Sequence, residues 1–218
     1  MIKNVVFDFG GVIVDLDREQ AVKAFVHLGL TDAGHILDKY HQTGIFQELE
    51  EGKLREEDYR EKLGQLCGRT LKREEVRQAW MSFVSGMDLR KLDYITELRK
   101  QGYRTFLLSN TNPYLMDYWA RTPQFTPSGK SIDTYFDKLY LSFEMRCMKP
   151  GMDIFKKMLE DARMQPEETL FIDDSITNIE SGKKAGMNTL CVSNLSDWRK
   201  QVDNLLAKVN QSGLIQKS

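Results

Sequence analysis

The sequence predicts an α/β protein built on a doubly wound parallel sheet, with a block of helices inserted after the first strand. Three observations support this fold class. Short apolar runs alternate with helical patterns from residue 89 to residue 192, as in proteins with parallel sheets. An earlier apolar run, residues 4–8, stands alone before a long helical stretch. The hydrophobic content of 41% and the charged content of 29% are ordinary for a globular protein.

The first predicted strand, residues 4–8, is a short apolar run of the kind found in buried parallel strands. Later strands are separated by helices with one apolar stripe, of which the first stops at Gly102. Residues 120–131 are predicted to form a loop, and the polar tail after Lys208 is predicted to fray. The other predicted strands span residues 105–108, 139–141, 169–172 and 189–192, and the helices between them end near residues 101, 162 and 185.

Residues 18–84 have helical apolar spacing throughout, without an intervening strand pattern. The clearest stripe repeats at i, i+3, i+4, i+7 and i+8, which is the spacing of one helix face. We interpret this aromatic-rich stripe as core packing and not as a cofactor site. The chain is expected to return to the sheet through a linker, Ser85–Asp88. The stripe consists of Val76, Ala79, Trp80, Phe83 and Val84.

Composition narrows the classes of function. The net charge of −1 provides no bulk field for nucleic acid or an anionic membrane, and no apolar stretch approaches the length of a membrane span. The N-terminus has no signal-peptide pattern. Cys67, Cys147 and Cys191 lack paired spacing, which indicates reduced thiols and neither a disulfide framework nor a zinc site. We therefore predict a cytoplasmic protein, and its oligomeric state stays open.

Asp8 is the most informative residue because it ends an apolar strand and is followed by Gly10 and Gly11. Open α/β sheets bind ligands at the carboxyl ends of their strands, so this carboxylate would face the crevice. The glycines would let the backbone approach a ligand closely. Taken alone, Asp8 could equally be a turn residue satisfied by its own backbone amides.

Polar residues after other strands favour the functional interpretation. Right-handed crossovers bring the carboxyl ends of parallel strands to one edge, where three acids, a cation and a hydroxyl would meet. Crowded acids repel one another, and a divalent cation relieves that conflict. Mg²⁺ prefers such an oxygen cage together with a substrate phosphate. The residues in question are Asp8, Ser109, Asn110, Lys149, Asp173 and Asp174.

The predicted chemistry is phosphoryl transfer to a carboxylate. One oxygen of Asp8 would bind Mg²⁺ and the other would attack phosphorus, giving an aspartyl-phosphate. Ser109–Asn110 would bind the phosphoryl oxygens, and Lys149 would neutralise their developing charge. Asp174 would complete the metal cage with Asp173 beside it. Singly, each has an ordinary alternative: Ser109 as a helix cap, Lys149 as a solvated lysine, and the acid pair as turn residues.

Four segments carry a family resemblance over nearly the whole chain. They are VVFDFGGVIVD, FLLSNTN, MKPGMDIF with Lys149, and FIDDSITNIESGKKAGM. In this order they resemble the haloacid dehalogenase-like superfamily. The resemblance implies a Rossmann-like core, residues 1–16 and 88–218, and an α-helical cap, residues 17–87. The pattern looks most like bacterial phosphatases of α-D-glucose 1-phosphate and the phosphatase domain of soluble epoxide hydrolases, which implies a small phosphorylated substrate.

The match departs from the family pattern in two places. Most of its phosphatases carry a second Asp two residues after the nucleophile, as general acid, where this chain has Gly10. The Gly10 carbonyl could still ligate Mg²⁺, and the glucose 1-phosphate group shares the glycine. Asp15 or Asp17, near the cap hinge, are candidate substitutes for the acid. Asn178 stands where many relatives have an acid, and it could orient a metal-bound water.

Three alternatives remain. A metal-independent haloacid dehalogenase would also lack the second Asp, but the acid pair Asp173–Asp174 would be a liability without a cation. A non-catalytic phosphate-binding module is supported only by Gly10. A phosphomutase would need the missing acid. Substrate choice is assigned to the cap, with Asp15–Glu19 and His41–Glu48 as candidate segments.

Overall fold

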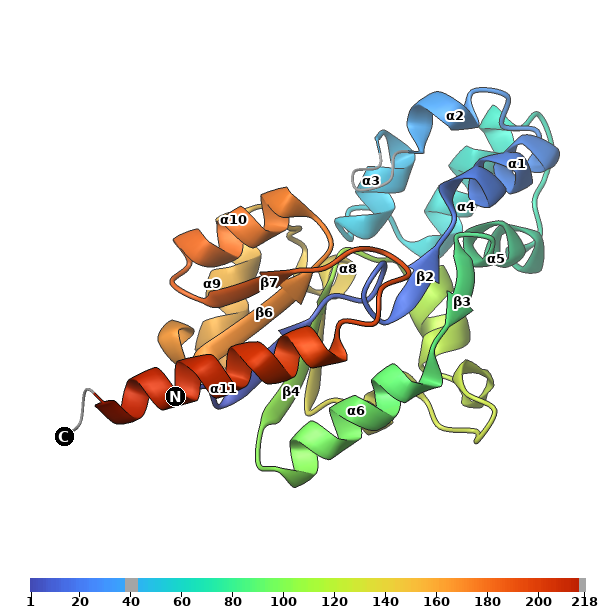
Figure 1. Cartoon of the computed structure of the whole chain (residues 1–218). Helices are drawn as coiled ribbons and strands as arrows, with labels where there is room; N and C mark the ends of the chain where they lie inside the picture. The colour runs from blue at the N-terminus through green and yellow to red at the C-terminus, as the bar shows by residue number, and fades with distance from the viewer. Residues whose placement is uncertain (38–42, 216–218) are drawn as a thin grey trace.

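The computed structural model describes residues 1–37 and 43–215, and it has a five-stranded parallel sheet at its centre (Figure 1). The strand order is β5-β4-β1-β6-β7. The prediction of a doubly wound parallel sheet is therefore confirmed. The strands are β1 (Asn4–Phe7), β4 (Arg104–Ser109), β5 (Lys138–Leu141), β6 (Thr169–Asp173) and β7 (Asn188–Cys191).

Alternate residues of each strand pack on opposite faces of the sheet, as the two-residue period of a strand requires. In β1, Val5 and Phe7 join one apolar cluster while Val6 joins another. The first cluster lies under helices α6 (Leu89–Lys100) and α11 (Arg199–Ile215), and the second under α9 (Met152–Asp161) and α10 (Ile176–Lys184). Figure 1 shows these two helical layers on either side of the sheet.

The order of the strands places a crevice beside β1. The chain passes from β1 to β4 and β5 on one side, then crosses to β6 and β7 on the other. Ligands of doubly wound sheets bind at this reversal, outside the carboxyl ends of the strands. Asp8 follows β1 and Asp173 ends the adjacent β6, so both acids lie at the reversal.

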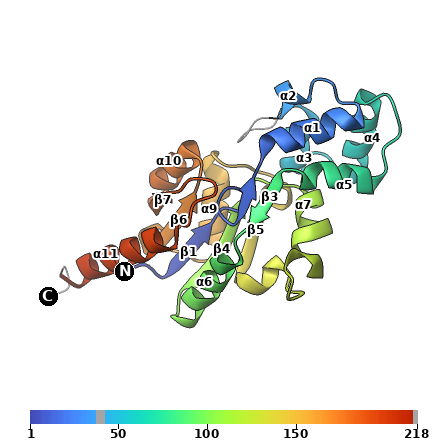
Figure 2. The same ribbon diagram turned by 45° about the vertical axis from the view of Figure 1, so that its right-hand side comes forward.

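Five helices between β2 (Val14–Leu16) and β3 (Val84–Met87) gather beyond the carboxyl edge of the sheet (Figure 2). They share a separate apolar cluster, which includes Trp80 and Tyr59 and also Tyr114 and Leu115 from the short helix α7 (Pro113–Leu115). The assignment of residues 17–87 as a cap domain stays a prediction, and His41 and Gln42 of the proposed specificity segment lie outside the described residues. The helices are α1 (Arg18–Leu28), α2 (Ala33–Ile36), α3 (Ile45–Glu50), α4 (Glu56–Leu66) and α5 (Arg73–Met81).

The connection to these helices differs from the prediction. A short strand, β2 (Val14–Leu16), leads out and pairs antiparallel with the returning strand β3 (Val84–Met87). The predicted helical stretch up to Val84 is therefore too long, since α5 ends at Met81. The predicted linker Ser85–Asp88 does return the chain to the sheet, but most of it belongs to strand β3. Strands of three and four residues are too short to show an alternating pattern, and their pairing is decided by the opposite strand.

The C-terminal segment also differs, because α11 continues through Ile215 where fraying was predicted. Its buried residues Val202 and Leu206 pack against the sheet. Just before it, Trp198 is fully buried and its indole Nε1 donates to the Val12 carbonyl at 2.9 Å. No described helix is long and apolar enough to cross a membrane. The remaining short helices are α7 (Pro113–Leu115), η1 (Met116–Ala120), η2 (Pro123–Phe125), η3 (Ile132–Tyr135), α8 (Ser142–Met145) and η4 (Pro166–Glu168).

We predict that Trp198→Phe lowers the free energy of unfolding by about 2 kcal/mol, because the buried Val12 carbonyl loses its donor. Urea denaturation measures this change. Trp119→Phe is the matched control, since Trp119 is partly buried against Phe9 and Phe125 and its indole nitrogen is in no hydrogen bond of the described residues. Equal losses in the two variants would contradict the assigned role of the hydrogen bond.

Candidate active site

Lys149 lies between two carboxylates at the reversal of the sheet. Its Nζ is 2.9 Å from Asp8 Oδ1 and 2.6 Å from Asp173 Oδ2. The Lys149 side chain is 1% exposed and that of Asp173 is inaccessible. Lys149 comes from the loop between α8 and α9 and not from the end of β5 itself. The structure thus brings together three of the predicted site residues from distant parts of the sequence.

Asp173 is held by more than the lysine. Its Oδ1 accepts hydrogen bonds from the Ser175 backbone N–H at 2.8 Å and from Asn178 Nδ2 at 3.1 Å. Asn178 therefore contacts this acid directly. With Lys149 on Oδ2, both oxygens of Asp173 are already engaged.

Asn110 fixes the backbone of the lysine. Its Nδ2 donates to the Lys149 carbonyl at 2.8 Å, and its Oδ1 accepts from the Lys149 N–H at 2.9 Å. Its side chain is therefore used to position Lys149, and a contact with substrate would fall to its backbone. Ser109 is buried beside it at the end of β4. The alternative of Ser109 as a helix cap is wrong, because Asn112 caps α7.

The charges and pKa values of the site favour the binding of a cation. Burial raises the pKa of Asp8 to about 7, Lys149 opposes the shift, and the charges of Asp173 and Asp174 reinforce it. Burial acts to lower the pKa of Lys149, but the two adjacent carboxylates outweigh burial and raise it. One buried ammonium group therefore does not neutralise the three acids at neutral pH.

The three acids fit a divalent cation. One oxygen from each of Asp8, Asp173 and Asp174 lies within 4.8 Å of the others. Gly11 has φ +74°, and a Cβ there would lie 2.3 Å from Asp174 Oδ2, so only glycine lets the turn after Asp8 approach this acid. Carboxylate oxygens, together with a backbone carbonyl such as that of Gly10, are the donors that Mg²⁺ prefers.

A small cavity of about 80 Å³ is lined by Phe9 and Gly10, the two residues that follow Asp8 in the chain. Gly10, Ser109 and Asn110 line it from the sheet, and Trp80 and Glu50 line it from the helices between β2 and β3. Its walls therefore come from both parts of the chain.

Glu50 is the site residue that the sequence did not reveal. It ends α3 and is 7% exposed. Burial raises its pKa to about 8; interaction with the Asn112 side chain lowers it, and the charge of Asp8 raises it further. In the sequence it belongs to an acidic run that resembles a solvated helix face, so no local signal distinguishes it.

The two proposed substitutes for the missing general acid are engaged elsewhere. Asp15 Oδ1 is 3.4 Å from the buried Lys91 Nζ. Asp17 is the N-cap of α1 and accepts from the Gln20 backbone N–H at 3.1 Å. Neither is among the described residues that line the cavity, so the structure does not support this prediction.

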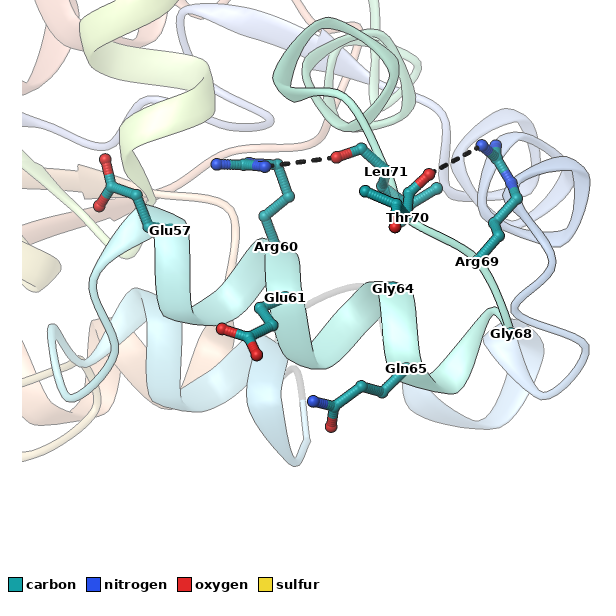
Figure 3. Close-up of a pocket in the computed structure, with 9 residues that line it drawn as sticks. All are labelled: Glu57, Arg60, Glu61, Gly64, Gln65, Gly68, Arg69, Thr70 and Leu71. Carbon is teal, nitrogen blue, oxygen red and sulfur yellow. Dashed lines mark hydrogen bonds between the residues drawn. The ribbon is translucent and has the colours of Figure 1, made fainter.

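A larger pocket of about 540 Å³ lies along α4 (Figure 3). Its two arginines already have partners: Arg60 donates to Glu56 and the Leu71 carbonyl, and Arg69 to Glu75 and the Leu28 carbonyl. With its cations committed, this pocket is a poor candidate for binding a phosphate.

Comparisons with known proteins agree with the geometry. A family model described as haloacid dehalogenase-like hydrolase matches residues 2–186. D-ribitol-5-phosphate phosphatase of Bacteroides thetaiotaomicron is 55% identical over 206 residues, covering 94% of this chain and 99% of that protein. The solved structure of a predicted hydrolase of this family from Porphyromonas gingivalis superposes with TM-score 0.90 and 42% identity, covering 94% of this chain and 98% of the other. A family enzyme from Bacteroides thetaiotaomicron, crystallised with magnesium and inorganic phosphate, gives TM-score 0.82 and 34% identity over 91% and 98% of the chains.

We predict that, without metal, Asp8→Asn is more stable than the wild type above neutral pH. The folded pKa of Asp8, about 7, exceeds its ordinary 3.8, so its contribution to stability is lost as pH rises between those values. In EDTA, the melting temperature of Asp8→Asn should exceed that of the wild type by more at about pH 8 than at about pH 5. Added Mg²⁺ should reverse the order by stabilising only the wild type. A difference that does not change with pH would contradict the assigned burial of Asp8.

Proposed function

The chain belongs to the haloacid dehalogenase-like hydrolase family and is a phosphoric monoester hydrolase, and we propose that it removes phosphate from an acyclic sugar alcohol such as ribitol 5-phosphate through an aspartyl-phosphate. The observation that carries the catalytic part of this proposal is the cluster of Asp8, Asp173 and Asp174 at the reversal of the sheet, with Lys149 in contact with the first two.

Asp8 is the proposed nucleophile. Its Oδ1 contacts Lys149 and accepts from the Phe9 backbone N–H at 2.7 Å. These contacts orient the carboxylate and leave its other oxygen to attack phosphorus. Attack gives a covalent phosphoaspartate, which water then hydrolyses to inorganic phosphate.

Lys149 is proposed to neutralise the charge on the phosphoryl oxygens as the bond to the leaving group breaks. Its backbone is held by Asn110 and its ammonium group by Asp173. Because both Asp173 oxygens are engaged, we assign that residue chiefly to positioning Lys149. Ser109 and the backbone beside it line the cavity where the phosphate would bind.

Mg²⁺ is the cofactor of this chemistry, and when bound it would screen the phosphate from Asp8 and polarise the phosphoryl group. Asp8, Asp174 and the Gly10 carbonyl are the proposed ligands. The relative crystallised with magnesium and phosphate supports this assignment.

The proposed substrate class rests on the relative that is 55% identical over nearly its whole length and is named for D-ribitol 5-phosphate. Glucose 1-phosphate, which the motif pattern suggested, is not supported by these comparisons. Residues of the predicted cap, residues 17–87, line one side of the cavity, so we assign substrate choice to that segment and expect it to move when substrate enters.

The alternative functions are less well supported. A dehalogenase needs no cation, yet three carboxylates converge here and two of them contact the same buried lysine. A binding module would need neither the orientation of Asp8 nor the doubly held Lys149. Both alternatives predict no release of phosphate from esters.

We predict that ribitol 5-phosphate exceeds glucose 1-phosphate in kcat/KM by about tenfold or more, measured as phosphate release. EDTA should abolish turnover. Asp8→Asn should lower kcat by about 10⁴-fold or more, because the nucleophile is lost. Asp93→Asn, an exposed acid on α6, is the matched control and should retain activity. Undiminished turnover in Asp8→Asn would overturn the proposed mechanism.

A further inference from the structure

The proposed reaction lacks a visible proton donor. When the bond between phosphorus and a sugar-alcohol oxygen breaks, the leaving alkoxide is strongly basic and needs a proton. Gly10 has no side chain to supply one. Asp8 and Asp173 contact Lys149, and Asp174 belongs to the candidate metal cage. The donor must therefore come from elsewhere around the cavity.

Two glutamates from the helices between β2 and β3 are buried, and they differ in their partners. Glu56 is 6% exposed and is surrounded by donors: Arg60, Arg73 and the Tyr114 hydroxyl. Its charge is compensated, which marks it as structural. Glu50 is 7% exposed and forms no ion pair with any residue that the structure describes.

Glu50 also lies in the right place. It lines the same cavity as Gly10, Ser109 and Asn110. It reaches this cavity from α3, on the side of the predicted cap, while the nucleophile lies on the side of the sheet. A substrate bound in this cavity would therefore meet Glu50 on the side of the predicted cap and Gly10, two residues after the nucleophile, on the side of the sheet.

We propose that Glu50 is the catalytic residue that protonates the leaving alcohol, in place of the acid missing at Gly10. The bond between Asp8 and phosphorus forms, the bond between phosphorus and the alcohol oxygen breaks, and the proton of the Glu50 carboxyl passes to that oxygen. The products are the free alcohol, the phosphoaspartate and the Glu50 carboxylate.

The second half of the reaction restores the acid. The Glu50 carboxylate takes a proton from water as the water oxygen attacks phosphorus. The bond to Asp8 breaks, inorganic phosphate forms, and Glu50 is again a carboxylic acid. Burial raises the pKa of Glu50 to about 8, so its carboxyl group is protonated before each cycle. This pKa suits an acid that must donate a proton near neutral pH.

This inference rests on the proposed phosphatase activity, and the test separates the two. Glu50→Gln keeps the size and polarity of the side chain but cannot donate an acidic proton. Its kcat/KM is measured with ribitol 5-phosphate, benzyl phosphate and 4-nitrophenyl phosphate. The two aromatic esters have similar size and no hydroxyl groups, but only nitrophenolate leaves readily without a proton. Hydrolysis of 4-nitrophenyl phosphate by the wild type tests the proposed phosphatase activity itself, independently of the role of Glu50.

We expect Glu50→Gln to lose about 100-fold or more on ribitol 5-phosphate and benzyl phosphate, and to keep nearly full activity on 4-nitrophenyl phosphate. Glu51→Gln is the matched control, since Glu51 pairs with Lys53 and does not line the cavity; it should resemble the wild type on all three esters.

Three outcomes would overturn the inference. Equal losses on all esters would indicate a structural role, and no loss on any would indicate no role. A loss confined to ribitol 5-phosphate would make Glu50 a contact to substrate hydroxyls and not a proton donor. If part of the variant is unfolded, the rates on all three esters fall equally, so the ratios of these rates do not change. If Glu50→Gln does not fold at all, Glu50→Ala is compared in the same way.

Discussion

The buried ammonium group of Lys149 is the interaction on which the site depends. It joins the carboxylate after β1 to the carboxylate that ends β6, and its backbone is fastened to the residue after β4. Removing the lysine would leave two buried carboxylates without their cation, at a cost of about 3–5 kcal/mol. A single residue from a loop therefore links the carboxyl ends of three strands of the sheet.

The same lysine leaves the site with an excess of acid, and this excess is useful. Of the three clustered carboxylates, those of Asp8 and Asp173 share the ammonium group of Lys149, so the folded chain gains by binding a further positive charge beside the nucleophile. Binding of the metal therefore relieves the repulsion among carboxylates that the fold brings together. Glu50 differs, because a buried carboxyl group without a neighbouring cation avoids an uncompensated charge by keeping its proton.

Much of this arrangement could be predicted from sequence, for a physical reason. Asp8 and the pair Asp173–Asp174 each follow an abrupt end of an apolar run, and parallel strands bring such ends together. The paired strands around Gly86 could not be predicted, because segments so short have no period of their own. Glu50 could not be predicted either, because only its burial beside the cavity distinguishes it from the acids next to it in the sequence.

The position of β1 has a consequence for how the chain acquires its structure during synthesis. This central strand pairs on both sides with strands made much later, since Asn4 lies opposite Arg104 and Thr169. The helices α1 to α5 emerge first and depend on local contacts, which form quickly. A nascent chain therefore carries an unpaired apolar strand ahead of helices α1 to α5, whose apolar cluster is completed only when Tyr114 and Leu115 emerge. Until β4 and β6 emerge, both edges of that strand are open to unwanted pairing, so this is the interval in which a chaperone would be of most use.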